Sequence, residues 1–135
     1  MTTAQAAARR AKIILCVDDQ IENTMALQAV LEGEGYGFRS ASSGAECLNL
    51  VNQFTPALIF MDIQMPEMDG FETCRRVRNV WTQRRTPIAF LTGCKTPEDV
   101  KAGLAAGGND FLLKPFDYPR LLARVEHWTR NRVTA

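Results

Sequence analysis

IILCVDD, at residues 13–19, is the stretch that decides the fold: a short apolar run that ends on two carboxylates. The pattern returns as ALIFMD at 57–62, IAFLT at 88–92 and FLLKP at 111–115. Short continuous apolar runs are typical of strands that a parallel sheet buries on both faces. Ligands of open α/β sheets bind at the carboxyl ends of the strands. The four runs therefore predict that three carboxylates, a hydroxyl and an ammonium meet at one edge of a sheet.

Composition indicates one globular domain and excludes several classes of protein. The chain has 135 residues with 46% hydrophobic residues, 23% charged residues and a net charge of +1. No global charge favours nucleic acid or an anionic membrane, and no apolar run approaches the roughly 20 residues of a membrane span. The four cysteines form no CxxC pair, and three of them fall inside apolar or periodic segments, which favours small core or near-core residues in a reducing compartment. We expect a cytoplasmic protein that binds neither nucleic acid directly nor a membrane.

Helical patterns alternate with the apolar runs. Residues 1–11 lack a core pattern and are expected to form a flexible, at most loosely helical extension before a domain at 12–135. Residues 37–41 read as a weaker strand near a sheet edge. The apolar positions of the helices recur at three- or four-residue spacing in these groups: Thr24, Leu27, Leu31; Ala45, Leu48, Val51; Phe71, Cys74, Val77; Leu121, Val125, Trp128. One further helix is expected to begin at Thr96-Pro97-Glu98 and to end at Gly107-Gly108.

Five β-α units of this kind predict a doubly wound α/β fold: a five-stranded parallel sheet with five helices. Five strands favour the order 2-1-3-4-5, in which the switch point lies between the first and third strands. Those are the strands that end at Asp18-Asp19 and at Asp62. Topology and chemistry thus predict the same location for the site.

The residues at the strand ends suit a cation beside a phosphoryl group. Three carboxylates in one crevice repel each other, and a hard divalent ion relieves the repulsion. Mg²⁺ is favoured, with Mn²⁺ as an alternative, because Mg²⁺ takes one or two carboxylates together with water and phosphate oxygens. Lys114 and Thr92 suit a phosphoryl oxygen, and Asp62 is the candidate nucleophile. His127 stands alone on the last helix, without zinc-type spacing.

Three stretches resemble the receiver domain of two-component response regulators. They are Asp18-Asp19, MDIQMPEMDG at 61–70 and LKPF at 113–116, and the resemblance covers about residues 12–130. It implies a phosphorylation-driven switch that is not an enzyme in the ordinary sense. In such a domain Asp62 takes a phosphoryl group from the phosphohistidine of a sensor histidine kinase or a histidine phosphotransfer protein. Slow autodephosphorylation then resets the switch.

The resemblance also implies a ligand set for the metal. Asp19 and Asp62 resemble direct Mg²⁺ ligands, and Asp18 one that acts largely through water. The backbone carbonyl of Gln64 completes the protein ligands. Lys114 pairs with the phosphoryl group, and its bond to Pro115 is expected to be cis.

A switch pair and an output face follow from the same resemblance. Thr92 is expected to move onto the phosphoryl oxygen while the ring of Phe111 turns inward. The output face is expected over residues 98–106 and 111–130, where it would bind an unidentified output protein or domain. A monomer or a phosphorylation-dependent homodimer fits this arrangement.

Several positions depart from the usual receiver pattern. Gly93 and Gly108 stand where alanine is usual, and Phe111 lacks the hydroxyl of the commoner tyrosine. The pair Gly107-Gly108 is expected to loosen the end of its helix. Gln64, Gly93 and Cys94 occupy positions expected to modulate dephosphorylation.

Three alternatives remain open at this level. A phosphatase of the haloacid dehalogenase kind also uses an aspartate and Mg²⁺, but it needs a second aspartate where this chain has Gln64. A flavodoxin-like flavin module needs a phosphate loop rich in Gly, Ser and Thr, whereas Asp18-Asp19 would repel a phosphate. Within the receiver class, the chain is a stand-alone regulator, the N-terminal part of a longer regulator or a module of a hybrid histidine kinase. Its start at Met1 favours the first two.

Overall fold

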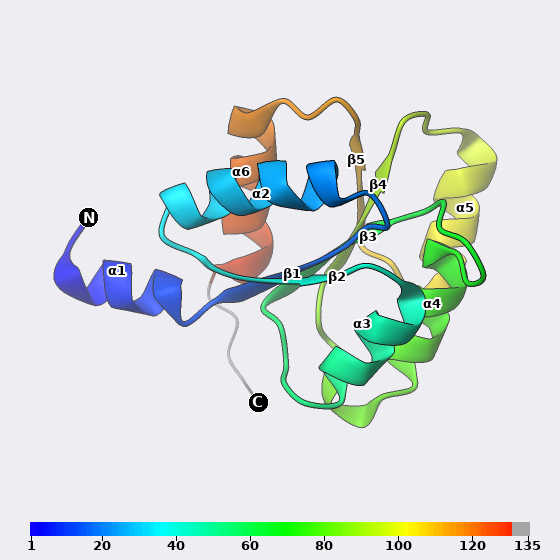
Figure 1. Ribbon diagram of the computed structural model, residues 1–135, viewed down its shortest axis with the longest axis horizontal. Coiled ribbons are helices and arrows are strands. Elements are labelled where there is room, and N and C mark those ends of the chain that lie inside the picture. The colour runs from blue at the N-terminus through cyan, green and yellow to red at the C-terminus, as the bar shows by residue number, and fades with distance from the viewer. Residues whose placement is uncertain (131–135) are drawn as a thin grey trace.

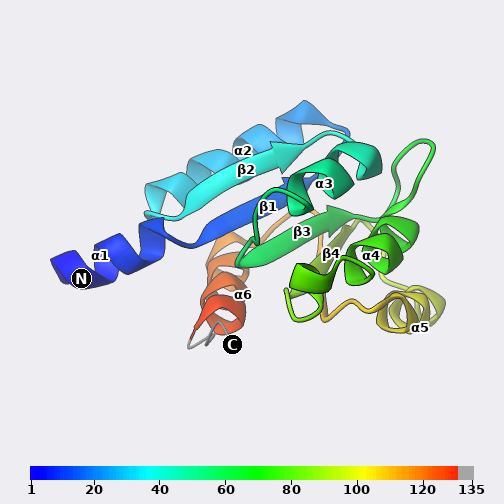
Figure 2. The ribbon, with the colours of Figure 1, turned by 90° about the horizontal axis from the view of Figure 1, so that it is seen from below.

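The chain forms a five-stranded parallel sheet with helices on both faces (Figure 1). The computed structural model describes residues 1–130. The strands are β1 Ile13–Val17, β2 Gly37–Ala41, β3 Leu58–Asp62, β4 Ile88–Thr92 and β5 Asp110–Leu113. Their order is β2-β1-β3-β4-β5, which confirms the predicted topology and puts the weak strand β2 at an edge (Figure 2).

Helices precede the first strand, connect consecutive strands and follow the last one. They are α1 Thr3–Arg10, α2 Ile21–Gly33, α3 Gly44–Val51, α4 Gly70–Arg78, α5 Pro97–Ala106 and α6 Tyr118–Thr129, with a short 3₁₀-helix, η1 Trp81–Gln83, between α4 and β4. No helix within residues 1–130 has the length and apolar character needed to cross a membrane.

Alternate residues of the buried strands enter two separate cores. Leu15 and Val17 of β1 pack in the core beneath α3, α4 and α5. Ile14 and Cys16 pack in the core beneath α2 and α6. Successive side chains of a strand point to opposite faces, so a sheet covered on both faces needs apolar residues at every position. This is why IILCV is apolar throughout.

The prediction of five helices was wrong, because residues 1–130 contain six α-helices. The additional one is α1, which has no buried residue and extends away from the sheet (Figure 1). Thr2 and Gln5 form a capping box, with the Thr2 hydroxyl accepting from the Gln5 amide at 3.0 Å and the Gln5 side chain accepting from the Thr2 amide at 2.7 Å. A helix stabilised by its cap rather than by burial leaves no apolar period to detect. Flexibility of residues 1–11 stays a prediction.

The buried face of α3 is shifted from the predicted one. The residues buried in this helix are Gly44, Cys47 and Val51. Ala45 is exposed and Leu48 is partly buried. Three-residue spacing fits two neighbouring phases of a helix equally well, and the small Cys47 packs as a hydrophobe.

A hydrogen-bonded cap closes the end of α5, and the expected loosening of this end stays a prediction. Gly107 has a φ of 103° and forms a left-handed cap, its amide donating to the carbonyls of Gly103 and Leu104. A Cβ on Gly108 would collide with the ring of Phe90, which fills the adjacent space. The two glycines therefore serve a cap that needs positive φ and a close aromatic contact.

Gly108→Ala is expected to lower the free energy of unfolding by about 1–3 kcal/mol, because the added methyl group overpacks the core against Phe90. Urea denaturation measures the change. Gly93→Ala is the matched control, since a Cβ at Gly93 meets no atom within 4 Å and should leave stability nearly unchanged. Equal effects of the two substitutions would contradict the packing argument.

Candidate functional site

The predicted site residues lie at the carboxyl ends of three parallel strands of the sheet. Asp18 and Asp19 follow β1, Asp62 ends β3, and Lys114 follows β5. Carboxylate oxygens of Asp18, Asp19 and Asp62 all lie within 4.8 Å of one another. Asp18 and Asp62 are buried, whereas Asp19 is exposed. The fold thus brings together three acidic groups from two strands that are 40 residues apart in the chain.

Lys114 joins two of these carboxylates. Its Nζ lies 3.2 Å from Oδ2 of Asp18 and 3.2 Å from Oδ1 of Asp62. Burial disfavours the ammonium charge, but the carboxylates of Asp62 and Asp18 outweigh burial and raise the pKa of Lys114. Lys114 is therefore a fixed positive charge at the mouth of the site. The peptide bond between Lys114 and Pro115 is cis.

One ammonium does not neutralise the cluster. Burial, and then the charge of Asp18, raise the pKa of Asp62 despite its contact with Lys114. A raised pKa means that the negative form of Asp62 lacks sufficient compensation. Asp19 is exposed, so the third carboxylate of the cluster lies at its solvent side. The donor set therefore fits a hard divalent cation bound by carboxylate oxygens.

Asp18 is oriented by residues that the sequence reasoning missed. Its Oδ1 accepts from the backbone amide of Gln20 at 2.9 Å, and its Oδ2 accepts from Nδ2 of Asn23 at 3.0 Å. Since Oδ2 also meets Lys114, both carboxylate oxygens of Asp18 have protein partners. The available signal was an asparagine five residues after Asp18, in the first turn of the following helix.

The loop after Asp62 is closed by a glycine. A Cβ on Gly70 would collide with the backbone carbonyl of Asp62, and the amide of Gly70 donates to the carbonyl of Ile63 at 2.8 Å. Asp69 caps α4, its carboxylate accepting from the amide of Glu72 at 2.8 Å. Asp69-Gly70, the pair that predicted a turn, thus brings the start of α4 into close contact with the backbone of Asp62. Gln64, within this loop, has an exposed side chain.

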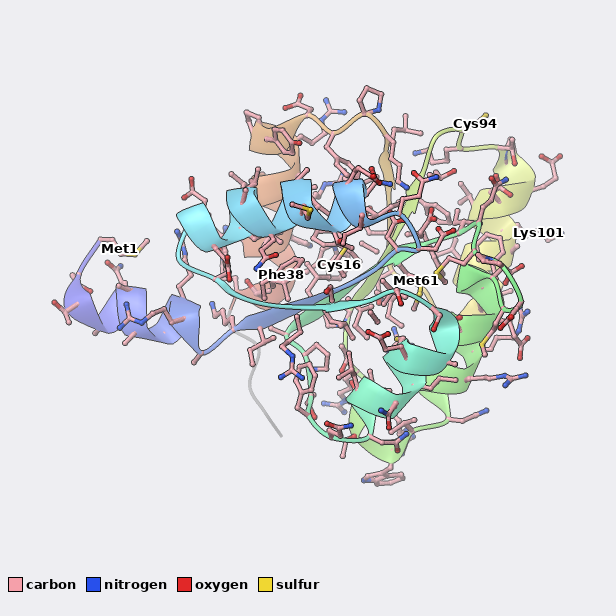
Figure 3. The ribbon with its side chains drawn as sticks, viewed as in Figure 1. Met1, Cys16, Phe38, Met61, Cys94 and Lys101 are labelled. Carbon is pink, nitrogen blue, oxygen red and sulfur yellow. The ribbon has the colours of Figure 1, made fainter. Side chains whose placement is uncertain are left out.

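Thr92 ends β4, but its hydroxyl is engaged within the following loop. It donates to the carbonyl of Cys94 at 2.9 Å and accepts from the amide of Cys94 at 3.2 Å. Gly93 and Cys94 are exposed, and Cys94 lies on the loop between β4 and α5, whereas Cys16 lies inside the fold (Figure 3). The structure therefore does not bring the Thr92 hydroxyl to the carboxylates.

The ring of Phe111 is half-buried between β5 and α5. Its centroid lies 5.3 Å from that of Phe90, which in turn lies 5.1 Å from that of Phe71. A Cβ on Gly103 would collide with the Phe111 ring, so the ring occupies space that only glycine leaves free at position 103.

Comparison with known proteins resolves the class of the site. Residues 14–126 match the model of the response regulator receiver domain. The chain belongs to the response regulator receiver family. It is 38% identical over 120 residues to the response regulator PleD of Caulobacter vibrioides, covering 89% of this chain and 26% of PleD. It is also 38% identical to MprA of Mycobacterium leprae, covering 87% of this chain and 51% of MprA.

Solved structures give the same class. The chemotaxis protein CheY4 of Vibrio cholerae has a TM-score of 0.83 and 33% identity, covering 86% of this chain and 97% of CheY4. The receiver domain of the sensor histidine kinase PA1611 of Pseudomonas aeruginosa has a TM-score of 0.81 and 30% identity, covering 87% of this chain and 96% of that domain. The latter is described with a magnesium ion coordinated in its active-site cleft.

Family membership gives the function in its general form. Receiver domains are phosphoacceptor switches of two-component systems, generally not classed as enzymes, and bind Mg²⁺ at an acidic site. They interact with histidine kinases and output domains. The match excludes the phosphatase and flavodoxin readings for this chain. The chain spans about a quarter of the length of PleD and half that of MprA.

Proposed function

We propose that Asp62 is the phosphoacceptor of this receiver domain. The observation that carries the assignment is the position of the Lys114 ammonium, 3.2 Å from Asp62 and 3.2 Å from Asp18 in a cluster of three carboxylates. Asp62 is the buried carboxylate at the end of a central strand, and Lys114 contacts its Oδ1, which leaves Oδ2 as the oxygen proposed to attack phosphorus. A positive charge at this point stabilises the transition state of phosphoryl transfer, in which negative charge is spread over the phosphoryl oxygens.

We infer that Asp19, Asp62 and the backbone carbonyl of Gln64 hold Mg²⁺ directly, with Mn²⁺ as a substitute. Asp18 acts largely through water, because Lys114, Asn23 and the Gln20 amide already occupy its oxygens. An ion held by these residues would supply positive charge against the oxygens of the incoming phosphoryl group.

The transfer needs no general base. The ionised carboxylate of Asp62 attacks the phosphorus of a phosphohistidine on a sensor kinase or phosphotransfer protein, forming a P–O bond as the P–N bond breaks. The electron pair of the P–N bond returns to the imidazole nitrogen. Lys114 then pairs with the acyl phosphate, and attack of water on phosphorus releases inorganic phosphate and regenerates the Asp62 carboxylate.

The acyl phosphate offers Thr92 a stronger acceptor than the carbonyl of Cys94. A move of the Thr92 hydroxyl from the loop to the phosphoryl oxygen changes the space beside Phe111 and shifts the equilibrium of the output face, formed by α5, β5 and α6. Gln64, Gly93 and Cys94 line the approach of water and modulate the lifetime of the acyl phosphate. The receiver then binds an unidentified output protein or domain, either as a monomer or as a phosphorylation-dependent homodimer.

The proposal is tested by incubating the protein with phosphoramidate and Mg²⁺. Intact-mass spectrometry is expected to show addition of one phosphoryl group, which EDTA prevents and hydroxylamine removes. Borohydride reduction followed by peptide mapping should locate the modification at Asp62. Modification at another residue, or labelling that is indifferent to EDTA, would refute the assignment.

Asn23→Ala is expected to weaken Mg²⁺ binding about tenfold, because Asp18 loses a partner that fixes its oxygen. Isothermal titration of the unphosphorylated protein with Mg²⁺ measures the change directly, without reference to phosphorylation. Gln28→Ala is the control, since Gln28 is exposed on the same helix. An unchanged Mg²⁺ affinity in Asn23→Ala would show that Lys114 and the Gln20 amide suffice to hold Asp18.

A further inference from the structure

The basic charge of the chain is concentrated in one short segment. Residues 75–85 contain five of the 16 basic residues and none of the 15 acidic ones, although the whole chain has a net charge of only +1. The rest of the chain therefore carries a net negative charge. The segment includes the end of α4, η1 and the turn into β4. It lies at the amino end of β4, whereas Asp62 and Lys114 lie at the carboxyl ends of their strands.

An exposed tryptophan stands in the middle of this segment. Trp81, the first residue of η1, is 77% exposed, the largest exposed fraction of any large hydrophobic residue within residues 1–130. The guanidinium of Arg84 stacks over its ring, 4.6 Å from the centroid. Trp81 and Arg84 thus form a flat pair that is apolar on one side and cationic on the other.

Hydrogen bonds to the interior of the protein hold residues 75–85 in place. Gln83 is fully buried, and its Nε2 donates to the carbonyls of Val51 at 2.9 Å and Phe54 at 3.0 Å. Arg78 donates to the carbonyls of Gln83 at 2.7 Å and Thr86 at 2.6 Å. The exposure of Trp81 is therefore a fixed feature of the surface and not the result of a loose turn. A side chain presented in a preorganised way loses little entropy on binding.

The residue types indicate a protein partner. Tryptophan and arginine are the side chains most enriched among the dominant contacts of protein interfaces. The other exposed large hydrophobic residues of the described chain lie on other elements: Met1, Ile21, Met25, Leu104, Leu113 and Tyr118. One aromatic anchor is poor support for a membrane face. Arg75 and Arg76 pair with Glu72 at 2.9 Å, which reduces the continuous positive track that a nucleic-acid backbone needs.

We propose that Trp81 and Arg84 form a docking surface for an acidic protein segment that carries one apolar side chain. Complementary charge attracts the segment to the exposed guanidinium of Arg84, and its apolar side chain packs against the Trp81 ring. The surface is separate from the phosphorylation site and from the output face of α5, β5 and α6. It provides this receiver with a second contact surface, at the opposite end of β4 from the phosphorylation site.

Nuclear magnetic resonance with ¹⁵N-labelled protein tests the proposal. The probes are two peptides of eight residues, one with glutamates around a single leucine and one with glutamates alone. The leucine peptide is expected to shift the indole signal of Trp81 and the amide signals of residues 80–85. Its affinity should exceed that of the all-glutamate peptide. Added salt should weaken the binding, because the attraction is between exposed charges.

Matched variants distinguish binding at this specific surface from attraction by the overall charge of the protein. Trp81→Ala and Arg84→Glu should each weaken the leucine peptide at least about tenfold, as expected for dominant interface residues. Lys101→Glu makes the same charge change on exposed α5 and should have little effect (Figure 3). Equal losses from Lys101→Glu and Arg84→Glu, or equal binding of both peptides, would overturn the proposal. So would tighter binding of single-stranded oligonucleotides or anionic vesicles at residues 80–85.

Discussion

Asp62→Asn is expected to abolish phosphorylation by phosphoramidate and Mg²⁺, because the neutral amide oxygen is not a competent nucleophile for phosphorus. Intact-mass spectrometry should show no added phosphoryl group under conditions that label the unmodified protein. The loss should be complete, since the neighbouring carboxylates Asp18 and Asp19 have other roles. Of these, Asp18 is engaged by Lys114 and Asn23.

The same substitution is expected to stabilise the metal-free fold. The pKa of Asp62 is raised in the folded protein, chiefly by burial and then by Asp18. A carboxyl with a raised pKa contributes stability below its ordinary pKa, and that contribution is lost as the pH rises through the folded-state value. Without Mg²⁺, the free energy of unfolding of the unmodified protein should therefore fall as the pH rises above the usual range of an aspartate. The Asn variant should lack this component of the fall, as urea denaturation at several pH values would show.

Asp69→Asn is the matched control for both measurements. Asp69 lies in the same loop and caps α4, and asparagine is an equally good cap. The control should retain labelling and the pH dependence of the unmodified protein. Undiminished labelling of Asp62→Asn would place the acceptor elsewhere in the cluster.

The sequence predicted those features that depend on buried strands. IILCV, LIFM and IAFL are apolar at every position because both faces of the sheet are covered, so the strands, their order and the polar residues at their ends could be predicted. Asp62 and Lys114 were placed together by topology alone, and the 3.2 Å contact agrees with that placement.

Features that depend on individual polar contacts, and not on buried apolar faces, were not predictable in this way. Asn23 was overlooked because its contact with Asp18 depends on the direction of a side chain at the start of α2. The helix α1 was missed because its capping box, and not a buried face, stabilises it. Thr92 was predicted at the right strand end, but its present partner, Cys94, follows from loop conformation and not from strand order. In each case the deciding interaction leaves no periodic trace in the sequence.

Arg78 is the strongest example of such a contact, and Arg78→Met is expected to lower the free energy of unfolding by about 3–5 kcal/mol. Its guanidinium donates to the carbonyl of Gly107 at 2.9 and 2.8 Å, and to Oδ1 of Asn109 at 3.0 Å. It also donates to the carbonyls of Gln83 and Thr86. Methionine keeps the apolar stem but leaves these acceptors without their charged donor, and bonds to charged donors contribute about 1.5–3 kcal/mol each.

Urea denaturation measures the loss, and two further variants test its origin. Arg76→Met, on the exposed face of the same helix, removes an ion pair with Glu72 and should change stability only slightly, because solvent screens such pairs. Arg78→Lys should recover only part of the loss, since an ammonium cannot span carbonyls that the planar guanidinium reaches together. Equal destabilisation by Arg76→Met and Arg78→Met would refute the role of the interior bonds.

Hydrogen exchange should locate the damage. Arg78 connects the end of α4 to the cap of α5 at Gly107 and, through Asn109, to the start of β4, whose Ile88 amide also donates to Asn109 Oδ1 at 2.8 Å. In Arg78→Met the amides of Gly107 and Gly108 should lose protection before those of β1 and β3. The elements α5 and β5 belong to the proposed output face. The hydrogen bonds of Arg78 to Gly107 and Asn109 therefore also hold the starting position of that face. Uniform loss of protection across the sheet would instead mean that Arg78 supports global stability alone.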